Sequence, residues 1–122
     1  MAREIYKKWA EESENDFNAG KVLHDAEIYN IAVFHFQQAV EKKLKACLYY
    51  NDQQPWGHSI FKLIQQITEI NDRFESILDK SRELDMHYTS TRYPDALPGL
   101  SPSELYNQET SERLKQKAKM II

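Results

Sequence analysis

The chain has 122 residues, the size of one ordinary domain, and we expect a single domain over residues 1–122. Its 16 basic and 19 acidic residues give a net charge of −3. This argues against nonspecific DNA coating, because phosphate binding usually needs a basic excess. The single cysteine excludes an internal disulfide. No apolar run is long enough for a signal peptide or a membrane span, so we expect a cytoplasmic protein that does not contact membranes.

Two long helices are predicted in the first half of the chain. Only 3 Gly and 4 Pro occur, which permits long uninterrupted helices. Apolar residues recur at three- and four-residue spacing over residues 3–25, with Gly20 on the inner face. This glycine either weakens the helix locally, by about 1 kcal/mol relative to alanine, or permits another helix to approach closely. Residues 29–50 form the second helix. It is apolar beyond one face, so it is either central to a bundle or in contact with a second subunit.

Three further helices are predicted in the second half. The first covers residues 58–70, and Asp72 can cap the next one, with Glu75 in capping-box spacing. Ser101 and Pro102 signal the last helix, because serine is a favoured N-cap and proline favours the first helical position. The expected inner faces contain Ile60, Leu63, Ile64, Ile67 and Ile70 in the third helix, and Leu105, Thr110, Leu114, Ala118 and Ile121 or Ile122 in the last. The pattern predicts an all-α, up-and-down bundle of four to five helices.

The stretch from Ser81 to Leu97 concentrates side chains that can carry chemistry. His87 is a natural general acid or base near neutral pH, and Arg82 can neutralise phosphate charge. Metal-free RNA cleavage needs little more, because the 2′-hydroxyl of the substrate is the nucleophile. On a straight helix the two side chains diverge by about 140°, so they converge only in a distorted helix or through a two-fold partner. A solvated helix face is the alternative.

The same stretch contains a second candidate, an anion site. Asp85, Tyr88 and Arg92 are spaced i, i+3, i+7 and share a stripe if the helix extends to the arginine. The carboxylate would hold the guanidinium in position, and the tyrosine would offer a hydroxyl. Tyr93 and Asp95 continue this site into the following loop. The alternative is a structural ion pair that locks the helix to that loop.

Two more candidates lie earlier in the chain. His58 stands at the expected start of a helix, whose free N–H groups favour an anion. A histidine in an interhelical hydrogen bond is the alternative. The polar side of the second helix, opposite its apolar arc, offers Gln38, Lys42 and Lys45 as possible contacts to a nucleotide or RNA, with Gln37 and Glu41 beside them. Such faces are usually just solvated.

Several familiar signatures are absent. The chain has no Walker loop, GxGxxG, CxxC pair or HExxH motif. Its four histidines, His24, His35, His58 and His87, are too scattered to propose a metal site. The sequence therefore predicts neither a bound metal nor a cofactor.

Three segments together resemble the HEPN family of small prokaryotic all-helical domains, which are often encoded beside a minimal nucleotidyltransferase. The segments are FHFQQAVEKKLKA at 34–46, GHSIFKL at 57–63 and LDMHYTSTRYPDA at 84–96. The resemblance spans almost the whole chain. It implies a homodimer whose second and fourth helices face a shared cleft, and it implies association with a nucleotide or RNA. Many members are metal-independent ribonuclease toxins with an R-x4-6-H motif, whose shortest spacing Arg82 and His87 match.

Two functions follow as expectations. The first is a nucleotide- or RNA-binding homodimer that acts with a separately encoded minimal nucleotidyltransferase. The alternative is a metal-independent ribonuclease toxin of a toxin–antitoxin pair. It would use His87 as the acid or base, and Arg82 or Arg92 to stabilise the phosphorane. A helical adaptor whose polar cleft is only structural is the third possibility, so whether the protein is an enzyme stays open.

Overall fold

The computed structural model describes residues 2–71 and 106–121, and these residues form four helices and no strand. The helices are α1 (Ala2–Asp25), α2 (Tyr29–Tyr50), α3 (Ile60–Thr68) and α6 (Gln108–Ile121). The all-α prediction is confirmed, and the predicted bounds of the first two helices agree with the structure. The helix predicted after Asp72 lies outside the described residues. Within the described part of the chain, no helix is long and apolar enough to cross a membrane.

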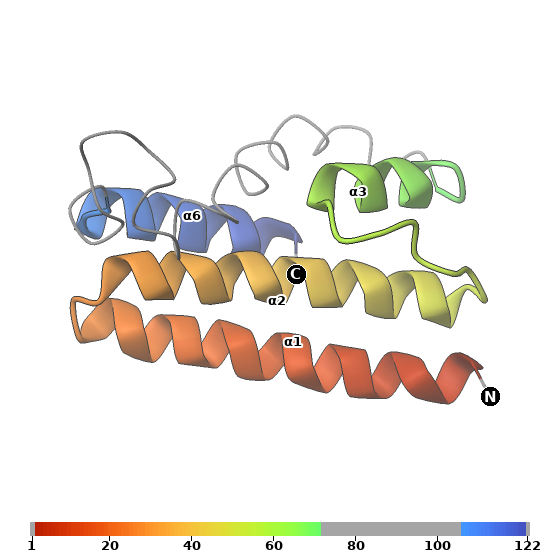
Figure 1. The fold of residues 1–122 in the computed structure, drawn as a ribbon, viewed down its shortest axis with the longest axis horizontal. Helices are drawn as coiled ribbons and strands as arrows, with labels where there is room; N and C mark the ends of the chain where they lie inside the picture. The colour runs from red at the N-terminus through yellow and green to blue at the C-terminus, as the bar shows by residue number, and fades with distance from the viewer. Residues whose placement is uncertain (1, 72–105, 122) are drawn as a thin grey trace.

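The central helix of the described bundle is α2. It contacts α1, α3 and α6. Figure 1 shows α1 and α2 as a long antiparallel pair, with α6 beside the first half of α2 and α3 beside its second half. A helix with neighbours on two sides has to bury more than one stripe, which explains why α2 is apolar beyond a single face.

A tight turn joins α1 to α2. Ile28 N donates to Leu23 O at 2.9 Å, and Glu27 N donates to His24 O at 3.0 Å. These two bonds are the pattern of a Schellman C-cap. Glu27 has a φ of 66°, in the left-handed region that usually favours glycine. The turn reverses the chain and sets α2 antiparallel to α1 (Figure 1).

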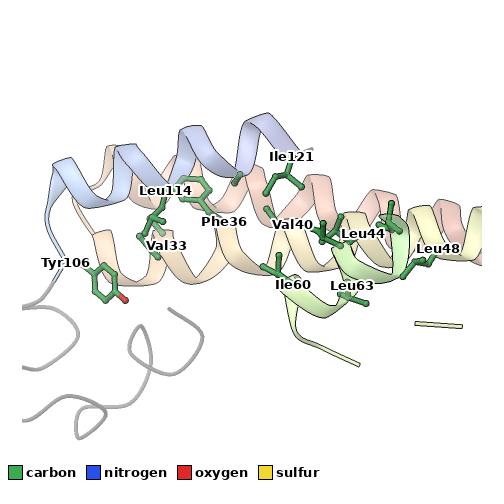
Figure 2. Packing of buried hydrophobic residues seen from close by; sticks show 14 residues of the cluster. Val33, Phe36, Val40, Leu44, Leu48, Ile60, Leu63, Tyr106, Leu114 and Ile121 are labelled. Atoms are coloured by element: carbon green, nitrogen blue, oxygen red, sulfur yellow. The ribbon is translucent and has the colours of Figure 1, made fainter. Parts of the chain in front are cut away.

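One cluster of buried side chains joins α2, α3 and α6 (Figure 2). Each fully buried side chain of this size contributes about 1.5–3 kcal/mol relative to its exposure. The inner faces predicted for the third and last helices are confirmed at Ile60, Leu63, Ile64, Ile67, Leu114, Ala118 and Ile121. The cluster therefore fixes α3 and α6 against α2, and it positions the loop before α3 beside the middle of the bundle.

At Gly20, α1 approaches α2 closely. A Cβ atom at this position would lie 2.5 Å from Cε1 of Phe36 and 3.2 Å from the backbone oxygen of Ala32. Real Cβ atoms do not approach other atoms to 2.5 Å, so no other residue fits here without a shift of the buried ring. The prediction that this glycine permits helix approach is confirmed.

Gly20→Ala should destabilise the domain, although alanine is the better helix former. Its propensity gain of about 1 kcal/mol is smaller than the overpacking penalty of about 1–3 kcal/mol, because the Phe36 ring is fully buried. Urea unfolding measures the difference. Asn18→Ala, at an exposed position of the same helix, is the matched control and should be neutral or stabilising. A Gly20→Ala variant more stable than wild type would contradict the packing.

The third helix is shorter than predicted. Ser59 is its N-cap, and the Ser59 Oγ accepts a hydrogen bond from Lys62 N at 3.3 Å. The helix ends at Thr68. Ile70 therefore lies beyond the helix and is 45% exposed, so its predicted place on the inner face is wrong.

The last helix begins later than predicted. Tyr106 and Asn107 are not helical, so a continuous helix from Ser101 is wrong, and the described helix begins at Gln108. The cause is a cap that the sequence interpretation missed. Asn107 Oδ1 accepts a hydrogen bond from Thr110 N at 2.9 Å, and asparagine is among the best N-cap residues. Residues 101–105 lie outside the described part.

Candidate functional site

Three polar side chains are buried in line along α2, and we call them the α2 polar row. Gln37, Glu41 and Lys45 are spaced four residues apart, so they share one face of the helix. Their exposed fractions are 1%, 5% and 5%. The alternative of a merely solvated face is therefore wrong for Lys45, and its predicted contact to a nucleotide or RNA stays a prediction. Burying a charged group without a partner is costly, so this row is where the described chain departs most from a simple apolar core.

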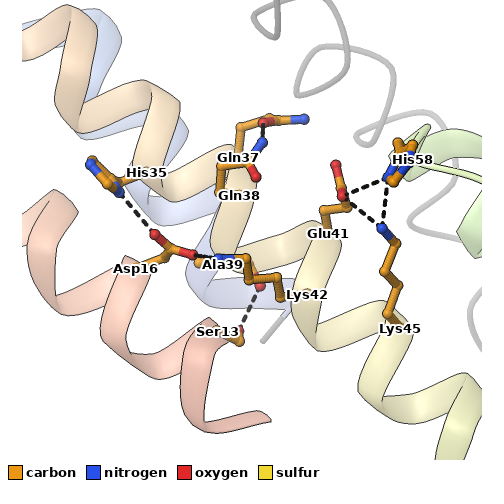
Figure 3. Close-up of polar contacts among 10 residues, drawn as sticks. All are labelled: Ser13, Asp16, His35, Gln37, Gln38, Ala39, Glu41, Lys42, Lys45 and His58. Carbon is orange, nitrogen blue, oxygen red and sulfur yellow. Dashed lines mark hydrogen bonds and ion pairs between the residues drawn. The ribbon is translucent and has the colours of Figure 1, made fainter. Parts of the chain in front are cut away.

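His58 meets the α2 polar row from the loop before α3 (Figure 3). Lys45 Nζ lies 2.9 Å from Glu41 Oε2 and 2.7 Å from His58 Nδ1. Glu41 Oε2 lies 3.3 Å from the same Nδ1. An ammonium group only donates, so Nδ1 accepts from it and the imidazole proton is on Nε2. The His58 side chain is 81% exposed, against 7% for the other two, so it is the point where the row meets solvent.

Trp9 of α1 lies on another side of the same lysine. Lys45 Nζ is 5.2 Å from the centroid of its ring, a cation–π contact. The ammonium thus has a carboxylate, an imidazole nitrogen and an aromatic face around it. These contacts explain how a lysine is held almost fully buried in the described bundle.

Two atoms of the α2 polar row have no hydrogen-bond partner among the described residues. They are Gln37 Nε2 and Glu41 Oε1. The other amide atom, Gln37 Oε1, accepts from Gln38 Nε2 at 2.7 Å, which sets the orientation of the amide. A buried polar atom without a partner costs about 1–3 kcal/mol. Unpartnered buried polar atoms are rare in folded proteins, and a ligand that bonds to them is one explanation for their presence.

Lys42 lies apart from this row. Its Nζ is 2.6 Å from Asp16 Oδ2 on α1, and His35 Nδ1 is 2.9 Å from Asp16 Oδ1 (Figure 3). Nearby, Ser13 Oγ donates to Ala39 O at 2.6 Å. These contacts hold α1 against α2. The structure therefore does not bring the Lys42 ammonium to the row.

The other predicted site residues lie outside the described residues. They are Arg82, Asp85, His87, Tyr88, Arg92, Tyr93 and Asp95. Of the predicted residues that are described, Lys45 and His58 are in contact, and Gln38 reaches the row through its amide contact.

Gln37 and Glu41 stand beside the predicted contacts on the polar side of α2, but their burial was not predicted. The usable signal was a carboxylate on an otherwise apolar flank of α2, between Phe34 and Leu48. A charged residue in such a place needs a partner within the fold, and a lysine four residues later supplies one.

A second histidine network has the composition of a catalytic triad. His24 Nδ1 lies 2.8 Å from Ser111 Oγ, and His24 Nε2 lies 3.1 Å from Glu112 Oε2. Ser111 is fully buried, so no substrate reaches its hydroxyl. A hydrogen bond from Gln116, with Lys115 and His24 nearby, lowers the pKa of Glu112, and desolvation opposes this. The network ties the end of α1 to the start of α6.

Cys47 is half-buried and unpaired with any other cysteine. Burial raises the pKa of its thiol, and Lys43 partly offsets this. Because the thiolate is the nucleophile, a raised pKa lowers the reactivity of this cysteine. It lines an apolar cavity of about 290 Å³ together with Tyr6, Leu44, Ile67 and Ile121, and the side chains that line this cavity come from all four described helices. In the described part of the chain, no three His, Cys, Asp or Glu side chains gather as a metal site.

The sequence of the chain matches one family model and a related protein from an archaeon. The HEPN domain model matches residues 6–122. The chain is 28% identical over 125 residues to the Methanocaldococcus jannaschii protein named "Putative toxin MJ1304", and the match covers 95% of this chain and 82% of that protein.

Three solved structures share the fold. A Thermus thermophilus protein matches with a TM-score of 0.90 and 30% identity, covering 99% of this chain and 94% of that one. An archaeal HEPN homologue matches with a TM-score of 0.78 and 28% identity, covering 95% of this chain and 90% of that one. A Thermotoga maritima HEPN domain protein matches with a TM-score of 0.75 and 30% identity, covering 94% of this chain and 91% of that one. With a family model over almost its full length and these neighbours, the chain belongs to the HEPN family.

Proposed function

We propose that this HEPN domain is a nucleotide- or RNA-binding homodimer that acts with a separately encoded minimal nucleotidyltransferase. The observation that carries the proposal is the α2 polar row, with the exposed His58 at its end. A buried ion pair is weak support for stability, because apolar residues of similar volume often do as well. A row of charged and amide groups in a core is therefore better explained by a ligand than by folding.

The exposed end of the row suits the phosphate group of a nucleotide. With Nδ1 accepting from Lys45, His58 has its Nε2–H free to donate to a phosphate oxygen. The predicted anion site of Asp85, Tyr88, Arg92, Tyr93 and Asp95, and the predicted contact of Gln38, belong to the same proposal. Lys42 does not, because its ammonium is paired with Asp16 away from the row. The net charge of −3 favours a local contact of this kind over broad electrostatic binding to nucleic acid.

Fluorescence anisotropy with a labelled short RNA and a labelled nucleotide tests the proposal. The wild type should bind at least one of them saturably, and the affinity should fall as salt rises. His58→Ala should weaken binding, since the exposed end of the row is lost. His35→Ala is the matched control, because that histidine lies in the Asp16 network away from the row. No saturable binding of either probe by wild type would sink the proposal.

A protein partner is supported by the relative named as a toxin, because a toxin has to be held inactive in the cell that makes it. Co-purification with the product of an adjacent nucleotidyltransferase gene tests this point. Light scattering tests the dimer, and a monomer at tens of micromolar concentration would contradict it.

A ribonuclease is the second candidate function, favoured by the same toxin-named relative and by the spacing of Arg82 and His87. We expect RNA cleavage in the presence of EDTA. His87→Ala should slow it by about 10²-fold or more, the usual contribution of a general acid or base. Absence of cleavage by wild type, or equal cleavage by the variant, would exclude this function.

A further inference from the structure

We infer that Gln37 and Glu41 form a subsite for the hydrogen-bonding edge of a nucleobase. The inference rests on the proposed function and says which part of the ligand the α2 polar row receives. Gln37 Nε2 is a donor and Glu41 Oε1 is an acceptor, and neither has a partner among the described residues. The two residues are 1% and 5% exposed, so water does not compensate these atoms freely.

The two atoms lie on one side of one helix. In Figure 3 the side chains of Gln37 and Glu41 project from the same side of α2, and the unbonded oxygen of Glu41 points away from Lys45. Four residues along a helix rise by about 6 Å, which flexible side chains span. The other carboxylate oxygen, Oε2, is held by Lys45 at 2.9 Å, so the free oxygen has a fixed direction.

The donor and acceptor together select the class of ligand. A phosphate offers only acceptors and would meet the Glu41 carboxylate, so a phosphate group does not fit between these atoms. A metal cation would meet the N–H groups of Gln37 and a carboxylate whose charge Lys45 already compensates. A nucleobase edge presents a donor beside an acceptor, and proteins read it with carboxylate and amide side chains. The two atoms supply the donor and the acceptor that such an edge requires.

The subsite predicts strong dependence on the base. A site built to hydrogen-bond a ligand rejects one that leaves its buried groups unpaired, by up to about 10⁴-fold in favourable cases. Both atoms are shielded in the free chain, so entry of a base requires a local rearrangement. Association should then be slower than diffusion-limited encounter, as is usual when binding requires a conformational change.

Competition binding tests the inference with the whole chain. The labelled probe that wild type binds is displaced by AMP, CMP, GMP, UMP or ribose 5-phosphate. At least one nucleotide should compete about tenfold or more better than ribose 5-phosphate, a difference of about one good hydrogen bond. Gln37→Met and Glu41→Gln should remove that preference. Gln65→Met, the same change at an exposed position of α3, should keep it.

Two results of this competition experiment would overturn the inference. Equal competition by ribose 5-phosphate, or an unchanged base preference in Gln37→Met, would overturn the inference. Gln37→Met removes no charge, so it remains a test even if Glu41→Gln fails to fold. If wild type binds RNA without base preference, only this inference falls. If it binds neither RNA nor nucleotide, the proposed function falls with it.

Discussion

Lys45→Met should destabilise the domain by about 3–5 kcal/mol, the usual loss when one member of a buried ion pair is removed. The methionine fills similar space, so the loss is electrostatic. The Lys45 ammonium lies 2.9 Å from the carboxylate of Glu41, whose side chain is 7% exposed. Without that ammonium, the buried carboxylate loses its ion-pair partner. Urea unfolding at neutral pH measures the change in the free energy of unfolding. The neighbouring His58 does not replace the ammonium, because its side chain is 81% exposed and lies farther from the carboxylate, at 3.3 Å.

The double variant Glu41→Met/Lys45→Met separates pairing from burial. With both charges gone, stability should return close to that of wild type or exceed it by about 1–4 kcal/mol. Lys42→Met is the matched control on the same helix. Its ion pair with Asp16 is more exposed, and we expect a loss of about 1 kcal/mol or less. Additive losses in the double variant would show that the pair is needed for folding itself.

Phe36→Ala should cost about 3–5 kcal/mol, as is usual for removing a buried aromatic ring. The ring is fully buried, lies 5.5 Å from the Phe17 ring between centroids, and fills the space that Gly20 leaves open. Its loss would leave a cavity beside Gly20, between α1 and α2.

Thermal and urea unfolding of Phe36→Ala should agree on this loss. Val22→Ala, at a position that is 68% exposed on α1, is the control and should stay within about 0.5 kcal/mol of wild type. A loss below about 1 kcal/mol in Phe36→Ala would mean that the core collapses around the missing ring.

The long helices of this domain are readable from sequence because their patterns repeat over many turns. The apolar spacing of residues 29–50 predicts α2 with the bounds that the structure has. Helix ends depend on single contacts instead. The cap from Asn107 decides where α6 begins, and no repeating pattern announces it.

The candidate site was less predictable, because burial depends on partners. Periodicity alone places Lys45 among solvated residues. Its burial follows from Glu41 four residues earlier and His58 thirteen residues later, and only the fold brings that histidine to 2.7 Å. The reverse holds for Lys42, whose partner Asp16 is on another helix. The roles of Arg82 and His87 remain predictions, since both lie outside the described residues.

The most direct test of the central claim is ligand binding by the Glu41→Met/Lys45→Met double variant, compared with wild type at equal folded concentration. If the α2 polar row is there to bind a ligand, the double variant should be as stable as wild type. It should nevertheless bind the labelled RNA or nucleotide at least tenfold more weakly, a loss of about 1.4 kcal/mol or more. Wild-type affinity in a stable double variant would contradict the account.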